Sequence, residues 1–238
     1  FKYWPTVYKL DEEGEFETLF GDRCSALKGK YDRTDPTIYE KDLDRELVVL
    51  RDLYYKTDEM PSYHNVLHLD IEIEIIGPLN PTTIREANAE ITSIAMIDVD
   101  TKQKICLILD KEEKLERIEK DGKLIIPCKT EKQLLKAFLT QWEVADPTLV
   151  IGWNSDFFDI PYLYYRIKKR LGDAVYRLSP IGKIDENQNL PESPIKIGLV
   201  ACLDYMLLLK KFIMKEEPSY KLGDIGTKYA KLGKIEYD

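Results

Sequence analysis

Three carboxylates recur at every second position of one short segment, as Asp70, Glu72 and Glu74. Apolar residues occupy the positions between them from Leu67 to Ile75, which is the alternation of a β-strand with one buried face. Side chains two residues apart in a strand share a face, so the carboxylates would stand in a row and repel one another. Two explanations are open: the row is a solvated strand face, or Asp70 and Glu72 hold divalent cations, because Mg²⁺ takes hard oxygen ligands and offsets the repulsion.

A second group of polar side chains lies about eighty residues further on, between a buried strand and a helix. The apolar run 149–153 predicts the strand, and Asn154 follows it in a loop. Asp159 stands at the start of a helix that reaches about Leu171, with Pro161 in its first turn, where the missing N–H costs little. An Asp at a helix start often caps the helix, and it can also offer an oxygen to a metal ion, so both roles are open for Asp159.

Further strands and helices must bring these two groups together. The expected strands are 91–97 and 104–109, joined by a turn at 98–101, and the expected helices are 131–143, 205–214 and 220–232. A polar stretch between apolar flanks predicts a β-hairpin over 183–199. The buried face predicted for helix 131–143 comprises Leu134, Leu135, Phe138, Leu139 and Trp142. Strands first, followed by alternating helices and a strand, imply an α/β fold with a mixed sheet flanked by helices.

The first 66 residues predict a small leading domain. Segments 3–10 and 15–19 have β-like patterns, and the charged segment 39–55 has a helical one. Its leucines recur at spacings of four and three, which predicts a buried helix face made of Leu43, Leu47, Leu50 and Leu53.

Composition narrows the class of protein. Of 238 residues, 44% are hydrophobic and 33% charged, which suits a folded core and excludes a disordered chain. No apolar run approaches the length of a membrane span, and the N-terminus lacks the pattern of a signal peptide, so we expect a cytoplasmic protein. The four cysteines form no CxxC pair and only two histidines are present, so we expect free thiols and no structural zinc. The net charge of -8 argues against a surface that is basic throughout, so a nucleic-acid substrate would be held locally or through metal ions.

Taken together, the two polar groups resemble a known family. Asp70-x-Glu72 in a strand, followed by the segment from Gly152 to Tyr162 with Asn154 and Phe158-Asp159, is similar to the first and second exonuclease motifs of family B DNA polymerases. The replicative polymerases of T-even-like bacteriophages are the most similar group. Later stretches that share the resemblance are Leu203-Asp204-Tyr205, Lys210-Lys211-Phe212, 218–222 and 233–238. The resemblance covers about Asn65 to the C-terminus well and the leading residues only loosely.

The resemblance implies a ribonuclease H-like fold and a proofreading 3′→5′ exonuclease that hydrolyses the 3′-terminal phosphodiester of DNA with two Mg²⁺ or Mn²⁺ ions. Asp70, Glu72 and Asp159 would be the catalytic residues and metal ligands, and Glu72 would also orient the attacking water. Asn154, Phe158 and Tyr162 would bind the terminal nucleotide. For Phe158, packing in the core is an equally open explanation.

The family has a fourth carboxylate, in a third motif of the form Tyr-x-x-x-Asp. Tyr220 and Asp224 have that spacing, but their surroundings resemble the helix that precedes the motif, so we expect the true Asp beyond Asp238 and the exonuclease domain, 67–238, to stop before it. This sequence also has Gly77-Pro78 where the family often has Phe-Pro, which affects the expected loop geometry. The hairpin 183–199 matches the place of a strand-separating hairpin in related polymerases, although a plain surface hairpin is as good an explanation.

The implied partners are a single-stranded 3′ end of DNA, the remaining polymerase domains and a sliding clamp, with no membrane contact and a host cytoplasm if the source is viral. Two alternatives stay open. One is a catalytically silent module that binds single-stranded DNA, and the other is an independent ribonuclease H-like nuclease.

Overall fold

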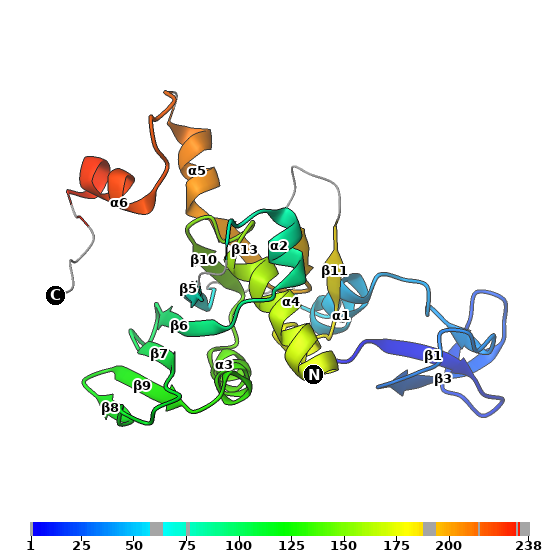
Figure 1. Cartoon of the computed structure of the whole chain (residues 1–238). Helices are drawn as coiled ribbons and strands as arrows, with labels where there is room; N and C mark the ends of the chain where they lie inside the picture. Colours follow the sequence, from blue (N-terminus) through cyan, green and yellow to red (C-terminus); the bar gives the residue numbers. More distant parts are fainter. Residues whose placement is uncertain are drawn as a thin grey trace.

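The computed structural model describes residues 2–57, 64–74, 77–187, 194–213, 215–231 and 233. Its main body is a mixed sheet of seven strands in the order β13-β10-β5-β6-β7-β9-β8 (Figure 1). In chain order these strands are β5 (Val66–Ile73), β6 (Ile91–Asp98), β7 (Lys104–Leu109), β8 (Ile118–Lys120), β9 (Lys123–Cys128), β10 (Leu149–Gly152) and β13 (Ala201–Asp204). β10 runs parallel to both β5 and β13, whereas β5, β6 and β7 form an antiparallel meander. The expected mixed sheet is thus confirmed.

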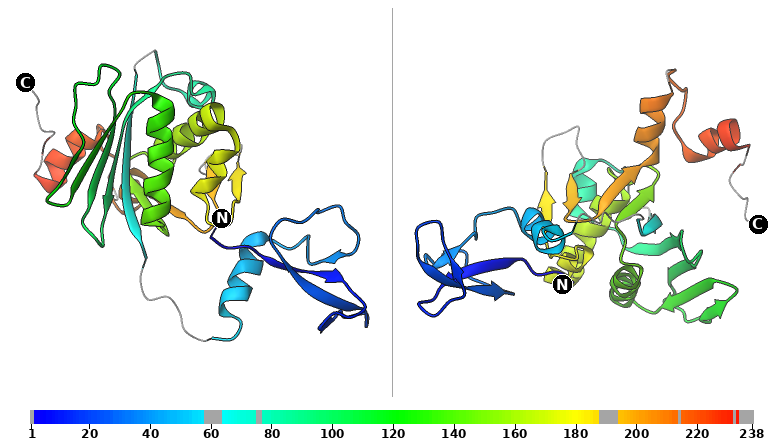
Figure 2. Two further views of the ribbon diagram at one scale, coloured as in Figure 1. Left: turned by 90° about the horizontal axis from the view of Figure 1, so that it is seen from below. Right: turned by 180° about the vertical axis from the view of Figure 1, so that it is seen from behind.

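Helices α3 (Glu131–Ala145) and α4 (Asp159–Leu171) cover one face of this sheet, as the left view of Figure 2 shows. The alternation of β5 places Leu67, Leu69 and Ile71 under these helices, each at most 3% exposed. All five residues predicted for the buried face of helix 131–143 lie in this core, within α3. The apolar patterns therefore identified the core side of both the strand and the helix.

The remaining elements are shorter. They are α2 (Pro81–Glu86), the 3₁₀ helix η1 (Gly172–Leu178), the hairpin β11 (Ile184–Glu186) and β12 (Ile195–Ile197), α5 (Tyr205–Phe212), α6 (Leu222–Ile225) and the π-helix η2 (Gly226–Ala230). The hairpin is antiparallel as expected, and the tip of the prediction, 188–193, lies outside the described residues. The single helix expected over 220–232 is instead the short α6 followed by η2, and residues 214 and 232 of the two predicted helices also lie outside the described part.

Three strands of the main sheet had no counterpart in the sequence patterns: β8, β9 and β13. Pro127 interrupts the apolar run of β9, and a proline cannot donate to a ladder, which lowers the strand signal. Nevertheless β9 pairs parallel with β7 over its whole length. All three residues of β8 are exposed, so this strand has no apolar face that a pattern could reveal.

The leading residues form a separate four-stranded sheet in the order β2-β3-β1-β4, seen beside the main body in Figure 1. Its strands are β1 (Thr6–Leu10), β2 (Phe16–Glu17), β3 (Arg23–Lys28) and β4 (Ile38–Tyr39), and α1 (Arg45–Tyr54) follows them. A small leading unit is therefore present, and the domain boundary after residue 66 stays a prediction.

The predicted buried face of α1 is wrong. Leu43, Leu47, Leu50 and Leu53 are 45%, 67%, 42% and 45% exposed, whereas Val48 and Val49 are buried. Polar contacts set this rotation of the helix: Arg51 pairs with Glu40, and the Asp52 carboxylate accepts the N–H of Thr6 at 2.9 Å. With these contacts in place Val48 and Val49 are buried, and the leucine stripe faces outward.

The N-terminal end of α1 also contacts the base of the hairpin. Lys183 forms an ion pair with Asp44 at 2.7 Å, and the Glu46 carboxylate accepts the N–H of Leu199 at 3.2 Å. Arg45 donates to the carbonyl oxygen of Ile181 at 3.1 Å. The leading unit is thereby joined to the segment that carries β11 and β12.

Candidate functional site

The candidate site lies where the parallel half of the sheet meets its antiparallel half. β10 ends at Gly152, whereas its neighbour β5 continues through Asp70 and Glu72. The polypeptide leaves β10 through the loop 153–158 and returns along α4. Ligands in open α/β sheets commonly bind at the carboxyl ends of parallel strands at such a point.

Asp70 and Glu72 are both exposed and share one face of β5, opposite the face that carries Leu69 and Ile71. Glu74, the third carboxylate of the predicted row, follows the end of the strand. The expected alternation is confirmed from Leu67 to Ile73, and Ile75 lies outside the described residues.

Asp159 is brought to β5 from the other segment. Its carboxylate accepts the backbone N–H of Ile71 at 3.0 Å, so it lies against the strand between the positions of Asp70 and Glu72. The side chain is 2% exposed, and this burial raises the pKa of Asp159 to about 7, with the charges of Asp70 and Asp204 acting in the same direction. Asp159 is the first residue of α4 and Phe158 occupies the N-cap, so Asp159 is not the capping residue.

The loop before α4 has a tight internal geometry. Asn154 adopts a left-handed backbone conformation with φ of 61°, and its carbonyl oxygen accepts the N–H of Phe158 at 3.0 Å. Gly152 permits the close approach of Ser155, because a Cβ at residue 152 would lie 2.5 Å from the Ser155 Cβ. The loop is thus folded compactly onto the end of β10.

Phe158 and Tyr162 are one helical turn apart, with ring centroids separated by 5.8 Å. Phe158 is half-buried and packs on the core, while Tyr162 is 1% exposed and donates its hydroxyl to the Ala89 carbonyl oxygen at 2.8 Å. Tyr162 and Ile73 also line a cavity of about 330 Å³ at the end of β5. The assignment of Asn154, Phe158 and Tyr162 to substrate binding stays a prediction.

Asp204 is a carboxylate of the site that the sequence reasoning missed. It ends β13 beside Gly152, is 2% exposed, and accepts the N–H of Asn154 at 2.9 Å. The second oxygen accepts the N–H of Asp156 at 3.3 Å. Burial, followed by the charge of Asp204, raises the pKa of Asp156 to about 6. An Asp between an apolar run and a helical pattern is an N-cap signal, which could have indicated Asp204.

The three predicted metal ligands are only partly assembled. Asp159 is near enough to Asp70 for that charge to raise its pKa, yet the residues that the structure describes contain no group of three or more His, Cys, Asp or Glu side chains arranged to hold a metal ion. Asp224 is exposed in α6. The metal-ligand assignment therefore stays a prediction.

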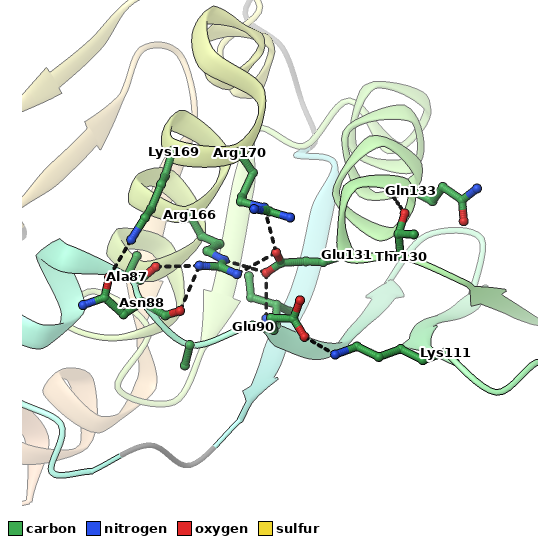
Figure 3. A network of polar contacts seen from close by, with 12 residues as sticks. Ala87, Asn88, Glu90, Lys111, Thr130, Glu131, Gln133, Arg166, Lys169 and Arg170 are labelled. Atoms are coloured by element: carbon green, nitrogen blue, oxygen red, sulfur yellow. Dashed lines mark hydrogen bonds and ion pairs between the residues drawn. The ribbon is translucent and has the colours of Figure 1, made fainter.

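A buried ion-pair network holds α4 in place (Figure 3). Arg166 of α4 makes a bidentate contact with Glu131 of α3, at 2.6 and 2.7 Å, and donates to the Ala87 carbonyl oxygen at 2.8 Å. Glu131 also accepts the backbone N–H of Ile91, the first residue of β6, at 2.9 Å, and a second arginine, Arg170, lies 3.2 Å from it. The helix that begins with Asp159 is thereby tied to α3 and to the sheet.

The structure also describes the lengths of the helices and the state of the cysteines. Among the residues that the structure describes, no helix has the length and apolar character needed to cross a bilayer. The four cysteines are free, with Cys24 and Cys128 buried.

Comparison with known proteins adds independent findings. The model of the DNA polymerase family B exonuclease domain matches residues 53–225. The DNA-directed DNA polymerase of Enterobacteria phage T4 is 28% identical over 273 aligned residues, covering 100% of this chain and 30% of that protein. The DNA-directed DNA polymerase of Escherichia phage RB69 is 37% identical over 123 residues, covering 50% of this chain and 14% of that protein. DNA polymerase 1 of Sulfurisphaera ohwakuensis is 27% identical over 157 residues, covering 60% and 17%.

The chain thus spans less than a third of the length of these relatives. The match to the exonuclease-domain model covers most of the chain, from the end of α1 through α6. It includes β5, the loop after β10 and the start of α4, which carry Asp70 and Glu72, Asn154, and Asp159 respectively. This chain belongs to the family B DNA polymerases and contains their exonuclease domain.

Proposed function

We propose that this site hydrolyses the 3′-terminal phosphodiester of DNA, as the proofreading 3′→5′ exonuclease of a DNA polymerase. The observation that carries the proposal is the contact of the Asp159 carboxylate with the backbone of β5, between the exposed Asp70 and Glu72. Carboxylates from two distant segments approach one another there, since the charge of Asp70 contributes to the raised pKa of Asp159.

Mg²⁺ or Mn²⁺ fits the chemistry of these donors. All three side chains offer hard oxygen ligands, and burial beside Asp70 holds the pKa of Asp159 near 7, an arrangement that a cation would relieve. In the proposal Asp70, Glu72 and Asp159 hold the cations, which when bound would activate a water and stabilise the leaving 3′ oxygen. Glu72, exposed on β5, orients the attacking water.

In the proposal, further residues of this chain bind the substrate. Asn154 and the half-buried ring of Phe158 position the terminal nucleotide, because a ring face can stack on any base. Tyr162 contributes through the cavity that it lines with Ile73.

The partners follow from the same proposal. The partners are a single-stranded 3′ end of DNA as substrate, the remaining polymerase domains and a sliding clamp. We propose that residues 1–66 belong to an N-terminal domain and 67–238 to the exonuclease domain. The hairpin of β11 and β12 lies on the N-terminal unit through Lys183 and Glu46, which suits a role in separating primer from template.

The test is carboxylate removal in the intact protein. We expect Asp70→Ala or Asp159→Ala to abolish Mg²⁺-dependent release of mononucleotides from a single-stranded oligonucleotide, with an unchanged far-UV spectrum. Asp100→Ala, an exposed turn carboxylate, is the matched control and should keep full activity. Cleavage at the normal rate in either site variant would refute the assignment.

A second candidate is a silent module that binds single-stranded 3′ ends. It is favoured by one observation: the described residues hold no ready-made group of three metal-binding side chains. Metal dependence separates the two functions. Oligonucleotide binding without cleavage at any Mg²⁺ or Mn²⁺ concentration would support the module.

A further inference from the structure

Asp204 joins two elements that meet at the site, and it has no part in the chemistry proposed above. It lies at the end of β13, in register with Gly152 at the end of β10. One oxygen accepts the N–H groups of Asn154 and Met206, both at 2.9 Å, and the other accepts the N–H of Asp156 at 3.3 Å. A single buried carboxylate thereby caps α5 and holds the loop before α4.

The loop bonds continue toward the proposed catalytic residues. The N–H of Asn154 is held by Asp204, and the carbonyl oxygen of Asn154 accepts the N–H of Phe158 at 3.0 Å. Phe158 is the N-cap of α4, and the next residue is Asp159. Asp204 is thus connected to Asp159 through two consecutive hydrogen bonds and one peptide linkage.

Asn154 has a left-handed backbone conformation with φ of 61°. Asn adopts this conformation more readily than most residues do, and contacts at its backbone fix it in the loop. Asp204 supplies such a contact at the N–H of that same residue.

We propose that Asp204 is a positioning residue of the exonuclease reaction, which holds Asn154 and the start of α4 in the geometry that the substrate requires. The inference rests on the proposed function. Both carboxylate oxygens are needed, because one accepts the N–H groups of Asn154 and Met206 and the other accepts the N–H of Asp156. A neutral side chain at this position can cap α5 but has fewer acceptor atoms for the N–H groups of the loop.

Two substitutions separate positioning from capping. Asn and Ser are as good as Asp at a helix N-cap, so Asp204→Asn and Asp204→Ser should keep α5, and the loop N–H that loses its acceptor should lower the melting temperature no more than the removal of another helix cap does. In Asp204→Asn an amide NH₂ replaces one oxygen and faces a backbone N–H of the loop, and in Asp204→Ser one hydroxyl must serve all the donors. We expect both variants to lower kcat/KM for a single-stranded oligonucleotide by about 10- to 100-fold, since displacements near 1 Å have effects of this size.

The experiment uses the intact protein and measures kcat and KM separately, together with thermal melting. Thr130→Ala is the matched control, because Thr130 caps α3 as Asp204 caps α5 and is not among the residues assigned to the site. It should lower the melting temperature without changing kcat/KM. Asp159→Ala is run in parallel, since its loss of cleavage tests the proposed function independently.

Full kcat/KM in Asp204→Asn or Asp204→Ser would overturn the inference while leaving the function intact if Asp159→Ala is inactive. A loss that merely follows the melting temperature, with Thr130→Ala behaving alike, would also overturn it, as would failure of both Asp204 variants to fold. Cleavage by Asp159→Ala at the normal rate would instead refute the proposed function.

Discussion

The buried pair between Glu131 and Arg166 allows a test of how burial determines the contribution of an ion pair to the stability of the fold. Glu131→Ala removes a carboxylate that is 0% exposed and leaves the Arg166 guanidinium, 5% exposed, without its anion. The backbone N–H of Ile91 loses its acceptor as well. Breaking one side of such a pair costs about 3–5 kcal/mol, because an uncompensated charge stays buried.

The same helix offers a matched control. Glu143 of α3 makes an equally bidentate contact with Arg177, at 2.8 and 2.5 Å, but these side chains are 46% and 36% exposed. Glu143→Ala therefore removes the same chemistry from a solvated setting, where a pair contributes about 0–1 kcal/mol. Neither substitution lowers the helix propensity of α3, since Ala is the best helix former.

Urea unfolding and thermal melting of both variants measure the difference. A chain of this size shifts its melting temperature by about 2–4 °C per kcal/mol, so we expect a fall of about 10 °C for Glu131→Ala and less than about 4 °C for Glu143→Ala. Equal shifts in the two variants would refute the argument that burial decides the contribution.

Three further outcomes are expected. The pKa of Asp159 is raised on folding to about 7, so the folded state binds this proton more tightly than the unfolded state does. The contribution of Asp159 to the free energy of unfolding is therefore complete below about pH 4 and falls by at most about 1.4 kcal/mol per pH unit as the pH rises to 7. Asp159→Asn should flatten this fall in metal-free melting curves. Gly152→Ala should lower the melting temperature by several degrees because its Cβ meets Ser155, whereas Gly223→Ala, with open space around it, should not. Leu47→Ala should change the free energy of unfolding by less than about 0.5 kcal/mol, and Val49→Ala should cost about 1–3 kcal/mol.

Each of these outcomes can fail in a distinct way. A pH profile of Asp159→Asn that matches the wild type would mean that Asp159 is not the titrating group. A stable Gly152→Ala variant would mean that the loop can move away from β10. A larger effect at Leu47 than at Val49 would restore the leucine face of α1 as its buried side.

The sequence by itself determined the elements whose patterns are local. The alternation in 67–73 and the helical spacing in α3 identified their core faces, because burial on one side leaves a period that can be read along the chain. The motif residues of β5 and α4 likewise indicated the family, and the exonuclease-domain match confirms that resemblance. The local order of residues was sufficient for these conclusions.

Only the tertiary structure decided the rest. α1 has an apolar stripe, but contacts of Arg51 and Asp52 with other elements set its rotation, so the stripe faces outward. The contact of Asp204 with Asn154 depends on the parallel pairing of β13 with β10, which brings together two residues that are fifty positions apart. The hydrogen bond from Ile71 to Asp159 likewise exists only because β10 ends before β5 does. Such contacts join residues distant in sequence, and no local period encodes them.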